Sequence, residues 1–182
     1  MTRLFLKRLL VTVALVWMAC TAVSCTNFTS ADSVDESEVY AAVIRQIYTV
    51  DDTFSGTFKP AVVYLINSTD DSVGDPEIEQ LVSHPLDAEM QKKITAALSD
   101  LPAQWIWVDS RDDVPINPDT GGVEGEGAII TLGNIHPQED DSIQVSGSIY
   151  VGNLAAGGQT YVLEQVDGNW TVTGNTGMGW VS

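Results

Sequence analysis

The stretch from Ala128 to Gly174 constrains the fold most, because it contains four β-rich segments in succession, separated by turn residues. The segments cover 128–135, 143–151, 160–166 and 169–174. In the second segment, apolar residues and one glycine alternate with polar residues and a tyrosine; the former are Ile143, Val145, Gly147, Ile149 and Val151. A period of two predicts an antiparallel strand with one buried face and one wetter face. Asp167 and Gly168 predict a tight hairpin turn, and a second glycine-bounded turn is expected before a last short strand.

Two segments before this region have helical spacing. Ser33 and Glu36 match a capping box, which predicts a helix with Ser33 as its N-cap. The apolar stripe of this helix consists of Val39, Tyr40, Val43, Ile44, Ile47 and Tyr48. A second helix is expected over 87–99, where Asp87 can cap the first turn and Lys92 and Lys93 face water.

Strands are expected on both sides of the second helix, at 60–67 and 104–109. A strand, a helix and a strand in this order predict a right-handed crossover that joins two parallel strands. The acidic turns after the two strands, "NSTDD" and "DSRDD", would then lie at the same edge of the sheet. We therefore expect an α+β fold: a mainly antiparallel sheet packed by two helices, with an early βαβ-like parallel pair.

The first residues of the chain differ from the rest. Arg3, Lys7 and Arg8 form a positive start, and the run from Leu9 to Val23 contains no charge. This run is shorter than the roughly 20 residues that a membrane-spanning helix needs. A basic start, a short apolar run and small residues together are typical of an export signal. The alternative is an uncleaved membrane anchor.

The residues that end this leader are more specific. The sequence "AVSC", which ends at Cys25, resembles the bacterial lipobox, and "WMAC", which ends at Cys20, is a looser second match. The resemblance implies cleavage before a cysteine that carries diacylglycerol, and we favour Cys25 because polar residues follow it directly. We expect a signal peptide over 1–24, a lipidated N-terminus and tether over 25–34, and one α+β domain over 35–182. The protein would be lipid-anchored in a bacterial envelope, facing away from the cytoplasm.

Charge and cysteine usage exclude several functions. Three of the 8 basic residues lie in the leader, so 5 remain against 25 acidic residues, and the formal charge is about 5 − 25 = −20. A surface this negative repels nucleic acid and anionic lipid headgroups. After cleavage at Cys25, the one remaining thiol is acylated. Disulfide and thiol chemistry then have no residue to use.

Motifs for metals and cofactors are weak. His84 and His136 lie in no zinc-binding pattern, and we interpret each as a surface or helix-entry residue. The glycine-rich pieces lack the order of a phosphate-binding loop, so no cofactor is expected. Calcium is the remaining alternative, because the loop over 112–127 offers the oxygen ligands Asp113, Asn117, Asp119 and Glu124. Their spacing does not match an EF-hand, so solvated loop charge is the simpler interpretation.

The candidate ligand site is the segment "WVDSRDD". It places Asp109, Arg111, Asp112 and Asp113 after a buried strand, where open α/β sheets tend to bind ligands. The simpler alternative for Arg111 is a local salt bridge to one of these carboxylates.

The end of the chain, "YVLEQVDGNWTV", is similar to the terminal hairpins of uncharacterised bacterial envelope proteins. It is also similar to the last strands of nuclear-transport-factor-2-like domains, in which a "DG-x-W" hairpin recurs. Both resemblances imply a packed structural hairpin rather than a site.

These features favour a non-enzymatic binding domain that is held on a membrane through its N-terminal lipid. Its partner would be an envelope protein or a small molecule. The alternative is a secreted hydrolase that uses carboxylates near Asp109–Asp113 and would need a concave pocket there.

Overall fold

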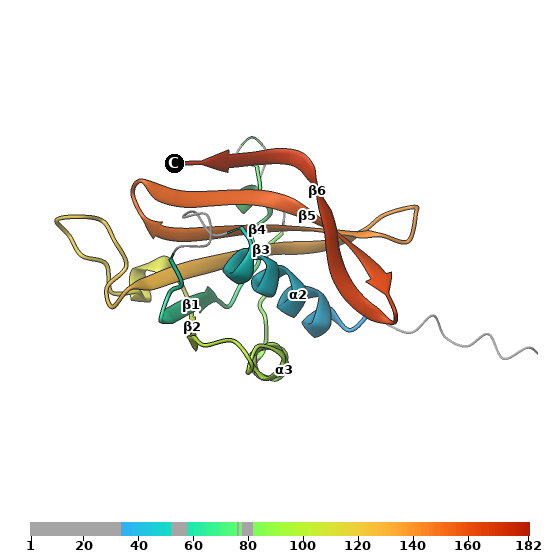
Figure 1. Cartoon of the computed structure of the whole chain (residues 1–182), viewed down its shortest axis with the longest axis horizontal. Coiled ribbons are helices and arrows are strands. Elements are labelled where there is room, and N and C mark those ends of the chain that lie inside the picture. Colours follow the sequence, from blue (N-terminus) through green and yellow to red (C-terminus); the bar gives the residue numbers. More distant parts are fainter. Residues whose placement is uncertain (1–33, 52–57, 76, 78–81) are drawn as a thin grey trace, which may run out of the picture. The chain divides into compact units, whose positions relative to one another are not determined.

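Six strands form a single sheet in the order β2-β1-β3-β4-β5-β6 (Figure 1). The computed structural model describes residues 34–51, 58–75, 77 and 82–182, so Ser33, Cys20, Cys25 and the expected leader and tether lie outside the described residues. The strands are β1 (Val62–Ile66), β2 (Gln104–Val108), β3 (Gly127–Pro137), β4 (Ile143–Gly152), β5 (Ala155–Val166) and β6 (Asn169–Val181).

The sheet is mixed, and its pairing confirms the expected α+β class. β1 runs parallel to β2, with Val62 opposite Gln104, and also parallel to β3 on its other side. All remaining neighbours are antiparallel. The two turns that follow β1 and β2 do meet at one edge of the sheet, because the Asn67 amide donates a hydrogen bond of 2.6 Å to Asp109 Oδ1. The expected parallel pair is therefore confirmed.

Two α-helices lie in the described part of the chain. α2 (Glu36–Thr49) begins after Asp35, whose carboxylate accepts a hydrogen bond from the Ser37 N–H. The prediction of Ser33 as N-cap was wrong. Asp35, two residues later, supplies the side-chain oxygen that accepts the capping hydrogen bond, and the helix begins after it. α3 (Ala88–Ala97) is capped by Asp87 as predicted, through hydrogen bonds from the N–H groups of Glu89 and Met90.

Both helices pack against the same face of the sheet. All six residues of the predicted stripe on α2 are buried, and Ile94 and Leu98 of the second helical segment are completely inaccessible. Gly147 of β4 lets α2 approach closely, since a Cβ there would lie 2.9 Å from Ile47 Cδ1. Figure 1 shows α2 lying along the sheet, with α3 next to α2.

The opposite face of the sheet is covered as well, by loops. A short 3₁₀ helix, η1 (Asp71–Val73), lies over β3 and β4, and the segment after a second one, η2 (Arg111–Asp113), buries Val114 and Val123 against Ile129. Ser146 on the supposedly wetter face of β4 is consequently only 4% exposed. The alternation in β4 predicts the strand correctly, but it does not reveal this second layer.

The last strand differs from the expectation of two short strands. β6 is one strand of 13 residues that bends along its length (Figure 1). Its irregular part is a bulge: Tyr161 pairs with Asn175 and Gln159 with Gly179, so residues 176–178 lie opposite Thr160 alone. The stretch expected to form a turn is therefore a bulge, in which Gly177 has a φ of 80°, while Gly174 and Gly179 stay paired with β5. In the described part of the chain, no helix is long and apolar enough to cross a membrane.

Candidate functional site

The most developed polar site lies where η1 meets β3 and β4. Asp71 is the first residue of η1, and the side chain of the preceding Asp70 accepts hydrogen bonds from the N–H and hydroxyl of Ser72. Gly133 makes room for Asp71, since a Cβ at Gly133 would lie 2.8 Å from Asp71 Oδ1. Asp71 is thereby pressed onto the sheet and is only 3% exposed.

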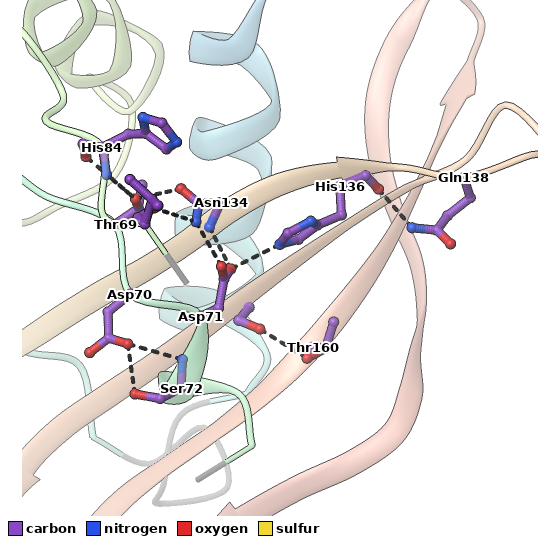
Figure 2. A network of polar contacts seen from close by, with 11 residues as sticks. Thr69, Asp70, Asp71, Ser72, His84, Asn134, His136, Gln138 and Thr160 are labelled. Carbon is purple, nitrogen blue, oxygen red and sulfur yellow. Dashed lines mark hydrogen bonds and ion pairs between the residues drawn. The ribbon is translucent and has the colours of Figure 1, made fainter. Parts of the chain in front are cut away.

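Three hydrogen bonds hold the Asp71 carboxylate (Figure 2). Oδ1 accepts one from the Asn134 N–H at 2.8 Å and one from His136 Nε2 at 3.0 Å. Oδ2 accepts one from the Asn134 side-chain amide at 2.7 Å. Asn134 lies at the β3 bulge between Leu132 and Ile135, which directs both its backbone and its side chain toward the carboxylate. A buried charge is thus compensated by donors from one strand.

These hydrogen bonds decide the charge of Asp71. Burial by itself raises the pKa of the carboxyl, but the hydrogen bonds from His136 and Asn134 outweigh it and hold the pKa below its ordinary value of 3.8. Asp71 is therefore ionised at neutral pH. A carboxylate held in this form is a poor general acid, and its hydrogen bonds fix its position.

The network continues from Asn134 to the segment before α3. The Thr69 hydroxyl donates a hydrogen bond of 2.6 Å to Asn134 Oδ1 and accepts one of 2.8 Å from the His84 N–H. Asn134 Nδ2 also donates to the Val82 carbonyl at 3.1 Å. His84 takes part through its backbone, while its imidazole points away from the network in Figure 2. The network ties two loops to β3.

The pairing with Asp71 fixes the tautomer of His136. An ionised carboxylate only accepts hydrogen bonds, so Nε2 of His136 must carry the proton. In the neutral ring Nδ1 is then an acceptor, and no described residue hydrogen-bonds to it. The His136 side chain is 41% exposed, against 4% for that of Asp71. The dyad thus presents an oriented imidazole at the surface, backed by a buried negative charge.

A cavity of about 370 Å³ lies beside this dyad. Its wall contains hydroxyl and amide side chains from several strands, together with one methionine: Gln144, Ser146, Thr160, Thr176 and Met178 join Asp71 and His136. The Ser146 and Thr160 hydroxyls share a hydrogen bond of 3.0 Å. Ser146 is thus paired with Thr160, and within the described residues no serine is hydrogen-bonded to His136. The arrangement offers hydrogen bonds to a ligand without a nucleophile paired to a base.

The candidate site from the sequence, Asp109 to Asp113, has a different character. All four proposed side chains are exposed and line none of the cavities described here. Asp113 accepts hydrogen bonds from Ser110 and completes a capping box for η2. The Arg111 guanidinium lies 3.8 Å from the centre of the Tyr150 ring, a cation–π contact in place of the salt bridge that was considered. The backbone N–H of Asp112 donates a hydrogen bond to Ser110 Oγ.

The oxygen-rich loop considered for calcium is held by hydrogen bonds within the loop itself. Asn117 Oδ1 accepts hydrogen bonds from the N–H groups of Asp119 and Thr120, and Ile116 forms an isolated bridge with Val123. Among residues 34–51, 58–75, 77 and 82–182, no group of three or more His, Cys, Asp or Glu side chains is placed to hold a metal ion.

Sequence reasoning missed Asp71, Asn134 and His136 as a site. They lie up to 65 residues apart and meet through a bulge that has no motif. Two weak signals existed: Gly133 inside a mostly apolar strand suggests a bulge or a close approach, and His136 is one of only 2 histidines.

Comparison with known proteins adds no relative to this picture. No family model matches the chain, and neither a curated protein nor a solved structure matches it.

Proposed function

We propose that this protein is a non-enzymatic binding domain, held on a bacterial membrane by a lipid on Cys25 and facing away from the cytoplasm. The anchor follows from the basic, apolar leader and the "AVSC" sequence that ends it. The binding role follows from the cavity beside Asp71 and His136.

One observation carries the binding role: the buried Asp71 carboxylate is held by three protein hydrogen bonds while the cavity beside it remains open. A carboxylate held in this way orients His136 and is not available as a nucleophile. The His136 ring and the hydroxyls of Thr160 and Thr176 can then serve as recognition groups. A ligand would use donors to reach Nδ1 of His136, and it would be neutral or cationic because the chain has a formal charge of −17.

The alternative, a carboxylate-dependent hydrolase at Asp109–Asp113, has weaker support. Such an enzyme needs two carboxyl groups in a cleft, one of them with a raised pKa. Asp109 and Asp113 are instead exposed and hydrogen-bonded to Asn67 and Ser110, contacts that stabilise the turn.

Thermal unfolding in the presence of small cations tests the binding role. The probes are the amides of the standard amino acids with uncharged side chains, which carry one positive charge on the α-amino group and are small enough for a cavity of about 370 Å³. A ligand that binds only the folded state raises the Tm, with a gain of about 2.7 kcal/mol at one hundred times its Kd. At least one amide should raise the Tm of the wild-type chain.

A matched variant locates the effect. Gln144→Trp places a large ring in the cavity at a half-buried position and should abolish the gain in Tm, whereas Gln104→Trp on β2, at the other edge of the sheet, should leave it unchanged. The proposal fails if no amide raises the Tm, or if the gain persists in Gln144→Trp.

A further inference from the structure

β6 is an outer strand of the sheet, and it carries no charge. No Asp, Glu, Lys, Arg or Pro occurs from Asn169 to Ser182, in a chain with 25 acidic residues. β6 has 13 residues, most of them exposed, and β5 is its only strand neighbour in the described part of the chain. The other edge strand, β2, has only 5 residues. Proteins usually protect a long edge strand with charges or proline, and β6 has neither, although its register shifts at two places.

Three cavities open beside β6, and one of them is lined by Gly179, Trp180 and Val181 at the end of the strand. Thr176 and Met178 of its bulge form one wall of the cavity at Asp71. The second cavity, of about 520 Å³, lies near the start of the strand and is lined by Trp170 together with Asp140, Asp141, Ser142, Glu164 and Gln165. Trp170 and Met178 are eight positions apart, which in an extended strand is up to roughly 25 Å. An edge with side-chain cavities along it is the arrangement that strand-addition sites use.

The charges around β6 favour a cationic occupant. Three carboxylates line the second cavity together with Trp170, and a cavity that offers carboxylates and an indole ring suits a Lys or Arg side chain. The electrostatic potential of the whole chain also attracts a cationic peptide, because the chain has a formal charge of −17. A second copy of the chain would bring the same negative charge to this edge and is disfavoured.

We propose that β6 binds an extended basic peptide segment of a partner protein by strand addition. Backbone hydrogen bonds along β6 supply the affinity, one basic side chain of the peptide lies against Trp170, and a second side chain enters the cavity at Asp71. This inference rests on the proposed binding role and names the class of partner.

Amide hydrogen exchange on the full chain in detergent micelles tests this directly. The probe is a peptide of about ten residues that alternates Thr and Lys, long enough to cover β6. Its matched control has Glu in place of each Lys. We expect the Lys peptide to slow exchange at β6 amides that point away from β5, such as that of Trp170, and the Glu peptide to have no effect.

Two variants of equal charge decide whether the edge itself is responsible. Met178→Lys places a positive charge on β6, which would repel the Lys side chains of the bound peptide. Gln104→Lys places the same positive charge on β2. The first should weaken binding of the Lys peptide by roughly fivefold or more, and the second should change it less than about twofold. Equal weakening by both variants would show attraction by net charge alone and would overturn the proposal.

Two further outcomes would also overturn it. If the Lys peptide slowed amide exchange in other segments and not in β6, the partner would bind elsewhere. Protection of β6 that grows with protein concentration in the absence of peptide would make a second copy the occupant. Because protection is measured at β6 and the full chain is kept in micelles, the result is independent of whether Cys25 is lipidated and of whether amino-acid amides bind at Asp71.

Discussion

Trp180 Nε1–H donates a hydrogen bond of 2.9 Å to the carbonyl oxygen of Val73, across 107 residues of sequence. This bond joins the outer strand β6 to η1, the short helix that carries Asp71. Gly158 of β5 lies beneath the contact, and a Cβ there would overlap the Val73 carbonyl oxygen and approach Trp180 Nε1 to 2.7 Å. The position of Asp71 over the sheet therefore depends on the absence of a side chain at Gly158.

Gly158→Ala should destabilise the protein by about 2 kcal/mol, because either η1 or β5 must move to accept the methyl group. Gly174→Ala on β6 is the matched control, since nothing lies within 4 Å of its added Cβ. We expect the control to change the free energy of unfolding by less than about 0.5 kcal/mol in urea titrations. Equal effects of the two substitutions would contradict the described contact between η1 and the sheet.

Removal of the Asp71 carboxylate should lower the free energy of unfolding more than removal of any exposed carboxylate. Asp71→Ala leaves donors of Asn134 and His136 without their acceptor at a buried position, which costs about 3 kcal/mol. Asp119→Ala removes an exposed carboxylate and should stay within about 0.5 kcal/mol of wild type. Chemical denaturation at pH 7 measures both values. An Asp71→Ala variant with the same free energy of unfolding as wild type would show that the network does not stabilise the fold.

The pH dependence of this difference follows from the lowered pKa of Asp71. A carboxyl group whose folded-state pKa is depressed contributes stability above its ordinary pKa and loses it as the pH falls through the folded-state value. The stability difference between wild type and Asp71→Asn should therefore persist above about pH 4 and shrink as the pH falls below that value. Unfolding free energies measured across this range check the prediction. A difference that grows on acidification would have the wrong sign.

Arg111 should contribute to stability and not to ligand binding. Its guanidinium lies over the Tyr150 ring, so Arg111→Ala should cost about 0.5 to 1 kcal/mol, the usual value of an exposed cation–π pair. The same variant should keep the rise in Tm that amino-acid amides give the wild-type chain. Loss of that rise with an otherwise stable fold would restore 109–113 as the ligand site.

Local patterns predicted most of the fold. The helical stripe of α2, the Asp87 cap, the parallel β1–β2 pair and the antiparallel strands were all confirmed. The Asp167–Gly168 turn was confirmed too, because both residues have the positive φ that a tight hairpin turn needs, 53° and 81°. These features depend on residues close in sequence or on a simple period, and such signals are readable from one chain.

The site could not be predicted in the same way. Asp71 is one of 25 acidic residues, and only the course of the chain brings it to His136. The acidic turn "DSRDD" attracted the prediction because it follows a strand, yet its side chains turned out to be exposed. The resemblance of the last hairpin to nuclear-transport-factor-2-like domains stays a prediction, as do the lipid anchor and the envelope location.

The mass of the mature chain tests the central claim, membrane anchoring through Cys25, most directly. The full-length chain is expressed in a bacterium, and the intact mass is measured in the membrane and soluble fractions, with Cys25→Ala and Cys20→Ala as matched variants. We predict a membrane-bound chain that begins at Cys25 and carries a diacylglyceryl group, unchanged in Cys20→Ala and absent in Cys25→Ala. A soluble, unacylated chain that still begins at Met1 would contradict the claim.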